Sequence, residues 1–266
     1  MTEKILENFS IAQICESGQC FRMEEMQDGR YRVIAGNRYL ELEQQGKVVR
    51  FDCSEVEYQN FWRHYFDIET DYGVIAAQIN PNDRYLTAAV QAAWGVRILN
   101  QDLWEMIISF IISQRNNIPR IMKSIDNLCE KLGEKIVFDY EGEHLVGYSF
   151  PNPEVMVRAD LSEFKFGYRE KYIRQTAEDI SEGKFDLEEV KNAVERGEDP
   201  EQVKEMLKKL KGVGEKVASC IQLFGLHQLS LFPIDTWIAK VEKMYYNGHF
   251  PVKKYKDTAG IMQQYL

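Results

Sequence analysis

Hydrophobic and polar residues alternate over residues 31–53, in the stretch YRVIAGNRYLELEQQGKVVRFDC. An alternation with a period of two is typical of strands that bury one face. Turn residues interrupt it at 35–37 (Ala-Gly-Asn) and at 45–47 (Gln-Gly-Lys), which suits tight hairpins. We therefore predict an antiparallel β-meander, followed over about 57–98 by helical patterns.

From Asn100 onward the pattern has the period of helices. The stretch LWEMIISFIIS is apolar nearly all round, which predicts a central buried helix with Gln101 and Asp102 as its cap. Gly, Pro and Asn residues separate further helical patterns at about 117–132, 153–160, 169–182, 186–196, 200–210, 214–226 and 235–245. The chain is therefore expected to be α+β. Residues 1–98 form an N-terminal domain with an antiparallel sheet and helices, and residues 99–266 form an all-helical domain.

The composition narrows the class of protein. With 266 residues, of which 44% are hydrophobic and 28% charged, the chain can bury a large core. No apolar run is long enough to cross a membrane and the start lacks a secretion signal, so we expect a cytoplasmic protein without a membrane partner. The five cysteines are never spaced as C-x-x-C, so we expect neither disulfides nor a metal site.

The charge is distributed unevenly. A net charge of −9, taken alone, argues against a nucleic-acid partner, because neutralising phosphates requires Lys and Arg. The acidic excess lies in stretches such as EDISEGKFDLEEV and ERGEDPEQ, whereas LKKLKGVGEK and GYREKYIRQ are basic. We therefore expect a small positive face on an acidic body.

A G-x-G sequence formed by Gly212, Val213 and Gly214 lies between two helical patterns. Glycines permit a tight hairpin whose backbone conformations side chains would obstruct. A helix that begins near Gly214 points unpaired N–H groups outward, and such a helix end attracts phosphate. These residues are therefore candidates for phosphate binding, although an ordinary linker between two helices can have the same sequence.

Two residues whose side chains could take part in catalysis follow the hairpin. Lys216 comes directly after it, and Asp235 later follows a proline and precedes the helical pattern TWIAKVEKMY, where a helix cap is expected. An L-x-G-V-G-x-K hairpin joined to such an aspartate resembles the helix-hairpin-helix DNA glycosylase superfamily. Within it, the chain resembles the 8-oxoguanine DNA glycosylase family in the segments GVGEKVASC, FPID, SGQCFR, NNIPR and FGYR.

The resemblance spans both predicted domains and implies a helix-hairpin-helix glycosylase domain after the N-terminal sheet. It implies a bifunctional DNA glycosylase and AP lyase that flips 8-oxoguanine out of duplex DNA, preferably opposite cytosine, and excises it in base excision repair. Double-stranded DNA with this lesion is the expected partner of a monomeric protein, at the nucleoid if the source is prokaryotic. No cofactor is expected, and a structural monovalent or divalent cation at the hairpin is left open as an alternative.

The resemblance makes Lys216 and Asp235 the catalytic residues. An amine can attack the sugar carbon C1′ and persist as a Schiff base, which permits β-elimination of the 3′ phosphate. The amine must be neutral to attack, so we expect Lys216 in a partly desolvated pocket near other cations. Asp235 at a helix N-terminus can stabilise an oxocarbenium-like sugar or assist proton transfer. A solvated lysine and a plain helix cap are the structural alternatives.

Four residues form the base pocket that the resemblance implies. The main-chain carbonyl of Gly18 would accept the hydrogen that oxidised guanine carries at N7, where ordinary guanine has an acceptor. Gln263 would read the pairing edge of the base, and Phe224 lies at a pocket-wall position. Cys220 falls one helical turn after Lys216 and so on the same face. A turn glycine and a buried small residue are the structural alternatives for Gly18 and Cys220.

Further residues would handle the gap that the extruded nucleotide leaves. The resemblance implies that Tyr168 wedges beside this gap and that Arg120 and Arg169 bind the opposite cytosine. Arginine suits this role because its fork donates to two acceptors on one base edge. Asn116 belongs to the same set. Surface side chains on a basic helix are the alternative.

The chain departs from the better-known members of this family at two positions. Arg115 stands where they carry an asparagine that fills the gap, and Trp237 stands where they carry a histidine near phosphate. Opposite-base preference and backbone contact are therefore expected to differ in detail. The family's aromatic residue that stacks on the flipped base would follow directly after Leu266, and without it a weaker affinity for the base is expected.

Other functions share parts of this pattern. An endonuclease III-like glycosylase for another oxidised base shares the lysine and aspartate but typically has a four-cysteine iron–sulfur loop, and the cysteines here are not grouped in that way. Glycosylases for alkylated bases manage without the lysine nucleophile. A non-catalytic helix-hairpin-helix DNA-binding module would have no use for Lys216, Asp235 and the Gly18 segment together.

Overall fold

The β-meander predicted from the alternating pattern forms the centre of an antiparallel sheet. A computed structural model of the chain describes residues 1–140 and 143–266. The meander comprises β3 (Tyr31–Ala35), β4 (Arg38–Gln45) and β5 (Val48–Phe51), and the flanking strands are β1 (Thr2–Ile5) and β2 (Met23–Glu25). The five strands are ordered β1-β5-β4-β3-β2. Both predicted turns contain a glycine with positive φ, which few other residues adopt.

Short helices cover this sheet and close the first hydrophobic cluster. They are α1 (Ile11–Glu16), α2 (Glu55–Glu57), a π-helical turn (Tyr58–Trp62) and α3 (Arg63–Tyr65). The cluster they bury is rich in aromatic side chains, among them Phe9, Phe51, Trp62 and Phe66, all 0% exposed. The sheet layer therefore has its own core.

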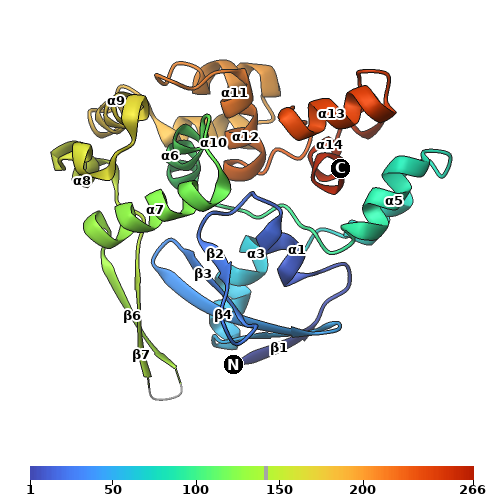
Figure 1. Cartoon of the computed structure of the whole chain (residues 1–266), viewed down its shortest axis with the longest axis horizontal. Helices are drawn as coiled ribbons and strands as arrows, with labels where there is room; N and C mark the ends of the chain where they lie inside the picture. Colours follow the sequence, from blue (N-terminus) through green and yellow to red (C-terminus); the bar gives the residue numbers. More distant parts are fainter. Residues whose placement is uncertain (141–142) are drawn as a thin grey trace.

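The helical layer is built around α6 (Leu103–Ser113), which lies in the middle of the other helices (Figure 1). Residues 103–112 of this helix are all buried, and the Asp102 carboxylate caps it by accepting the Glu105 N–H at 2.9 Å. The predicted central buried helix and its aspartate cap are thus confirmed. The other helices are α4 (Tyr72–Ala77), α5 (Arg84–Ala92), α7 (Ile118–Leu132), α8 (Pro153–Arg158), α9 (Glu170–Ser181), α10 (Leu187–Glu195), α11 (Pro200–Leu207), α12 (Glu215–Gly225), α13 (Thr236–Tyr245) and α14 (Ala259–Tyr265).

The α+β class is confirmed, because an antiparallel sheet is followed by a mostly helical remainder. The division at residues 98 and 99 stays a proposal. Tyr72, Ile75 and Leu86, which precede it, already pack in the helical core. No helix within residues 1–140 and 143–266 has the length and hydropathy needed to span a membrane.

One expectation was wrong, namely that every element after Asn100 is helical. Strands β6 (Lys135–Tyr140) and β7 (Glu143–Tyr148) pair as an antiparallel hairpin beside the sheet layer (Figure 1). Phe138 of this hairpin stacks on Tyr39 of β4, with ring centroids 4.7 Å apart. The run KIVFDY is rich in β-branched and aromatic residues, so its local preference for strand was the overlooked signal.

The segment SGQCFR, which precedes β2, joins the two layers. The Gln19 side chain donates to the Arg97 carbonyl at 2.8 Å and accepts the Leu99 N–H at 2.8 Å. Arg22 donates to the Tyr148 carbonyl and pairs with Glu105 of α6 at 3.5 Å. Burial raises the pKa of the Glu105 carboxyl to about 7, against the opposing effect of Arg22. The segment that contains Gly18 is therefore held rigidly against α6.

Candidate active site

Lys216 lies in the first turn of α12, and its side chain is exposed to solvent. One turn further along the helix, Cys220 is buried, and the pKa of its thiol depends on the charges around it. Burial raises the pKa of the Cys220 thiol to about 11, the charge of Lys216 and a hydrogen bond with it lower this pKa, and the charge of Asp235 raises it. The charges of Lys216 and Asp235, which are far apart in the chain, therefore both act on the Cys220 thiol.

Asp235 is held at the start of α13, as expected of a helix cap. Its Oδ1 atom accepts the backbone N–H groups of Trp237 and Ile238, both at 2.8 Å. Among the residues that the structure describes, none donates to Oδ2. The two N–H groups and the helix dipole favour the ionised carboxylate, and the second oxygen is left to act on a substrate.

The turn between α11 and α12 forms the predicted hairpin. Gly212 has a φ of +88°, and a Cβ added there would lie 2.5 Å from the Cδ2 atom of Tyr172. Val213 is buried and anchors the turn in the helical core. No side chain caps α12, so its first N–H groups remain available to a phosphate.

Gly214 does not meet the expectation that both hairpin glycines adopt conformations closed to other residues. Its φ is −100°, and no atom lies within 4 Å of an added Cβ. The protein alone therefore has no steric need for glycine at this position. A close approach of another molecule to the start of α12 would supply such a need.

Gly18 lies in the turn after α1 with a φ of +74°, and a Cβ added there would lie 3.3 Å from the Ile118 side chain. Within the described part of the chain no group donates to its carbonyl. A chain of hydrogen bonds connects this turn to the C-terminal helix, because Gln19 donates to Gln264 at 3.4 Å and Gln264 donates to Gln263 at 2.9 Å. The structure therefore links the Gly18 turn to Gln263.

Phe224 is buried within the helical core, where its ring stacks on Phe110 of α6 at 5.7 Å. It lies one turn after Cys220, so the two residues share a face of α12. Its role as part of a pocket wall stays a prediction.

The candidate opposite-base residues gather around one groove of about 930 Å³ between α7 and the turn before α9. Its lining includes Arg115, Asn116, Arg120 and Arg169. Arg115 and Arg120 are exposed, and among the described residues neither guanidinium has a protein partner. Tyr168 lies beside the groove with 45% of its side chain exposed. Two free cations are therefore available on this face.

Arg169 is engaged instead with the backbone of the neighbouring loop. Its Nε atom donates to the Gln114 carbonyl at 2.9 Å and its Nη2 atom to the Arg115 carbonyl at 3.2 Å. The Tyr168 hydroxyl donates to the same Gln114 carbonyl at 3.3 Å. Gln114 in turn donates from its side chain to the Gly212 carbonyl at 3.0 Å. Gln114, which no sequence motif singled out, thus connects the hairpin with the opposite-base residues.

Comparison with known proteins identifies the family. The sequence model for the N-terminal domain of 8-oxoguanine DNA glycosylase matches residues 3–107. A protein of Saccharomyces cerevisiae named N-glycosylase/DNA lyase is 28% identical over 264 residues, which cover 89% of this chain and 68% of the relative. The solved structure of MBOgg1 in complex with a low-affinity DNA ligand is 32% identical, with a TM-score of 0.89 over 100% of this chain and 94% of the other.

The 8-oxoguanine glycosylase/lyase of Clostridium acetobutylicum in its apo-form is 36% identical, with a TM-score of 0.86 over 99% of this chain and 93% of the other. A relative that is 36% identical is thus matched over nearly the whole length of both chains. The chain belongs to the 8-oxoguanine DNA glycosylase family.

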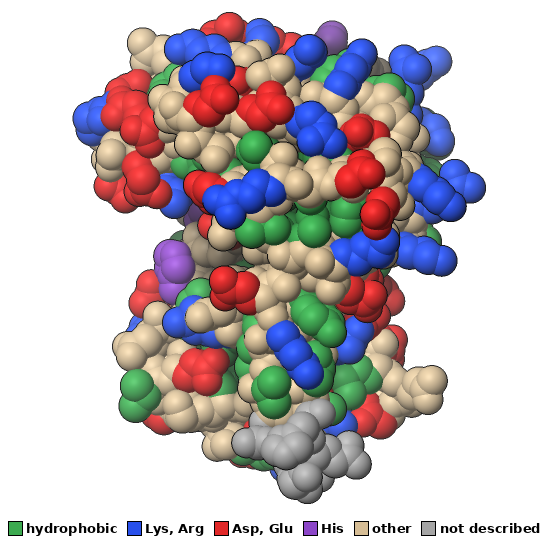
Figure 2. Space-filling model, turned by 90° about the vertical axis from the view of Figure 1, so that its left-hand side faces the viewer, with side chains coloured by type: hydrophobic (Ala, Val, Ile, Leu, Met, Phe, Trp, Pro, Cys, Tyr) green, Lys and Arg blue, Asp and Glu red, His purple; other side chains and the backbone are tan. Residues whose placement is uncertain are grey.

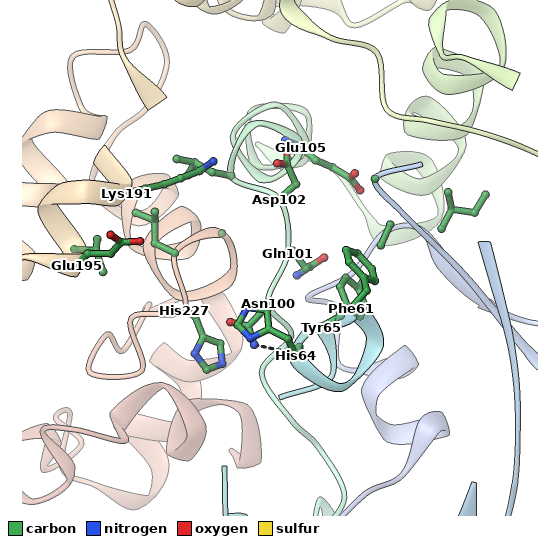
Figure 3. Close-up of a pocket in the computed structure, with 17 residues that line it drawn as sticks. Phe61, His64, Tyr65, Asn100, Gln101, Asp102, Glu105, Lys191, Glu195 and His227 are labelled. Atoms are coloured by element: carbon green, nitrogen blue, oxygen red, sulfur yellow. Dashed lines mark hydrogen bonds between the residues drawn. The ribbon is translucent and has the colours of Figure 1, made fainter. Parts of the chain in front are cut away.

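The predicted catalytic pair of this 8-oxoguanine DNA glycosylase family member is open to solvent, because Lys216 is exposed and Asp235 is only partly buried. A cavity of about 470 Å³ lies between the layers, where Lys191 and Glu195 of α10 face Phe61 and Tyr65 across Asn100–Asp102 (Figure 3), but neither Lys216 nor Asp235 lines it. The expectation of a partly desolvated Lys216 was therefore wrong for the protein alone. The physical reason is that the Lys216 side chain projects into solvent from the first turn of α12, whereas the next two residues, Val217 and Ala218, are buried.

Basic and acidic side chains gather in different parts of the family member's surface, as the sequence suggested. Figure 2 shows Lys and Arg side chains along the right-hand edge of the upper, helical lobe, whereas Asp and Glu gather at its upper left. A net charge of −9 is therefore compatible with a basic face.

The two hairpin glycines are expected to respond differently to alanine. Gly212→Ala should lower the free energy of unfolding by at least about 1–3 kcal/mol, because alanine disfavours positive φ and its Cβ would overlap Tyr172. Gly214→Ala should lower the free energy of unfolding by no more than about 1 kcal/mol, because alanine is a poorer N-cap than glycine, but it should weaken DNA binding, because the added methyl group occupies the space of a phosphate. Chemical denaturation and a binding isotherm test both. An unaltered isotherm for Gly214→Ala would remove the start of α12 from the phosphate site.

The two arginines assigned to the opposite base should also differ. Arg120→Ala is expected to relax the preference for cytosine without a change in stability, because its guanidinium has no partner in the described protein. Arg169→Ala should relax the preference and also lower the free energy of unfolding by about 1–3 kcal/mol, since it leaves backbone carbonyls without donors. Cleavage of duplexes with each of the four opposite bases gives the preference. Unchanged ratios would contradict the assignment.

Proposed function

We propose that this protein is a bifunctional DNA glycosylase and AP lyase that removes 8-oxoguanine from duplex DNA, preferably opposite cytosine, in base excision repair. The observation that carries this proposal is the Asp235 carboxylate at the start of α13, with one oxygen used in capping and the other unused, together with Lys216 in the first turn of α12 directly after the hairpin. Family membership supports it. A relative at 36% identity has been solved with double-stranded DNA that contains cytosine opposite 8-oxoG.

The first step is extrusion of the damaged nucleotide, since C1′ cannot be reached inside the duplex. The backbone N–H groups at the start of α12 hold a phosphate, with Gly212, Val213 and Gly214 forming the turn. Tyr168 wedges beside the gap. Arg115, Asn116, Arg120 and Arg169 meet the orphaned base along the groove that they line. DNA bound at this face also covers Lys216, which supplies the desolvation that the protein alone lacks.

Base selection rests on the Gly18 carbonyl, which no described group in the protein uses. It accepts the N7–H of the oxidised base and faces a lone pair on ordinary guanine, so the undamaged base is rejected by repulsion. Gln263 reads the pairing edge of the base, and Cys220 and Phe224 form the wall next to Lys216.

Base excision follows by nucleophilic substitution. The neutral Lys216 amine attacks C1′, and as the new N–C1′ bond forms, the C1′–N9 bond breaks and its electron pair leaves with the base, which takes up a proton. Opening of the sugar ring then gives an imine between Nζ and C1′. Asp235 stabilises the positive charge that develops on the sugar, with the oxygen that is not used for capping.

Strand cleavage uses the same imine as an electron sink. Removal of a proton from C2′ forms a C2′–C3′ double bond and expels the 3′ phosphate. Water then hydrolyses the imine, which releases the sugar and returns Lys216 to its free form. We place the protein in the cytoplasm and, if the cell is prokaryotic, at the nucleoid, where the DNA lies.

A panel of duplexes treated with borohydride tests the function. We expect covalent trapping and strand cleavage with 8-oxoguanine opposite cytosine, weaker reaction opposite the other bases, and none with undamaged guanine. Faster reaction with an oxidised pyrimidine would instead indicate an endonuclease III-like activity. Binding without trapping on every duplex would indicate a non-catalytic DNA-binding module.

A further inference from the structure

Helix α13 exposes an aromatic and basic face to solvent. Trp237 and Met244 are each 70% exposed, and Lys240 lies between them with its amine 4.2 Å above the Trp237 ring. These positions recur at the spacing that places side chains on one side of a helix. The helix is anchored through its other side, by the buried Ile238 and Glu242.

Trp237 takes no part in either hydrophobic cluster. Trp62 and Trp104 are 0% and 7% exposed and belong to hydrophobic clusters, whereas Trp237 is a member of neither. Leaving a large indole in water forfeits the stability that its burial would bring. Its exposure therefore points to a surface that another molecule covers.

The position of this face identifies the molecule. The backbone N–H of Trp237 donates to the Asp235 carboxylate, so the ring projects from the same helical turn as the proposed catalytic carboxylate. An indole carries no charge and cannot neutralise a phosphate, but it stacks well on bases and sugars. Lys240, held against the ring, supplies the positive charge that a phosphate requires.

We propose that Trp237 packs on the base and sugar of the nucleotide next to the everted lesion, on the damaged strand, while Lys240 meets the adjoining phosphate. The proposal rests on the proposed function, because it takes DNA at Asp235 as given. Extrusion of the lesion unstacks its neighbours, and the indole replaces part of the stacking that the neighbour loses. The interaction is independent of base identity, because every base has a π-face.

Binding of the full chain to a duplex with an uncleavable abasic analogue opposite cytosine tests the proposal. Trp237→Ala should weaken binding about tenfold to a hundredfold, the range found for loss of one base–aromatic stack. Trp237→Phe should stay within about threefold of the parent protein, because phenylalanine also stacks. Lys240→Ala should flatten the dependence of log Kd on log salt by about one phosphate contact, and Trp237→Ala should not.

A fluorescent base confirms the place of contact. With 2-aminopurine next to the abasic analogue, the parent protein should quench the emission by stacking, and Trp237→Ala should leave it bright. A Trp94→Phe background removes the other exposed indole, so that quenching of protein fluorescence by acrylamide reports on Trp237, because Trp62 and Trp104 are buried. Chemical denaturation of each variant should give unchanged stability, since the ring is exposed.

Three results would overturn the proposal. Binding of Trp237→Ala that equals that of the parent would show that the ring makes no contact. Binding of Trp237→Phe that is as weak as that of Trp237→Ala would assign the contact to the indole N–H and a phosphate. A bright 2-aminopurine signal with the parent protein would place the ring elsewhere. The proposed function fails separately, if the parent protein cannot be trapped on 8-oxoguanine duplexes.

Discussion

Lys216→Gln is expected to abolish covalent trapping on an 8-oxoguanine duplex and to slow base excision on the order of a thousandfold or more. Glutamine has a similar length but no nucleophilic amine, so neither the bond to C1′ nor the imine can form. The side chain is exposed and Gly214, not Lys216, caps the helix, so folding should be unaffected. Single-turnover excision and gel analysis after borohydride reduction measure both effects.

Lys209→Gln is the matched control. It removes the same charge from the same basic segment, and Lys209 is likewise exposed, but it precedes the hairpin. We expect somewhat weaker binding to DNA and full trapping at saturating protein. Trapping that survives Lys216→Gln would show that another amine is the nucleophile.

Local patterns predicted the scaffold well, because they record which face of an element is buried. The apolar stretch at 103–113 and its aspartate cap identified α6, and the position of Asp235 after a proline identified the start of α13. Gly212 was recognisable since its positive φ is a property of the backbone at that residue alone. Each of these features can be seen within a few residues of sequence.

Features that depend on distant contacts were not visible in this way. The hydrogen bond from Gln114 to the Gly212 carbonyl joins residues 98 positions apart, and no periodicity marks it. The β6–β7 hairpin is stabilised by Phe138 against Tyr39 in the other layer. The exposure of Lys216 depends on how the other elements pack around α12, and a sequence pattern does not contain that information.

The roles of some site residues were predicted from resemblance to the family and not from local sequence patterns. Gly18 and Gln263 were assigned because their segments match the family, not because any spacing required them. The structure adds that hydrogen bonds through Gln19 and Gln264 link the two. It also adds that the groove at Arg115 and Arg120 offers guanidinium groups without a described partner. Those contacts turn the assignments into proposals that single substitutions can test.

Asp235→Asn is expected to separate the two tasks of this residue. Asparagine still accepts the Trp237 and Ile238 N–H groups and is as good a helix cap, so the free energy of unfolding should change by no more than about 0.5 kcal/mol. It lacks the negative charge that stabilises the developing cation on the sugar. Single-turnover excision should therefore fall about a hundredfold to a thousandfold, a loss typical of removing one electrostatic contact to a transition state.

Asp235→Ala completes the comparison, because it removes the cap as well as the charge. Its excision rate should match that of Asp235→Asn, while its free energy of unfolding should fall by about 1 kcal/mol. If the asparagine variant excises 8-oxoguanine at the parent rate and the alanine variant does not, Asp235 acts through the geometry of α13 alone. The cation on the sugar would then have to be stabilised by another group. Equal losses of activity with unequal losses of stability place the carboxylate charge in the reaction itself.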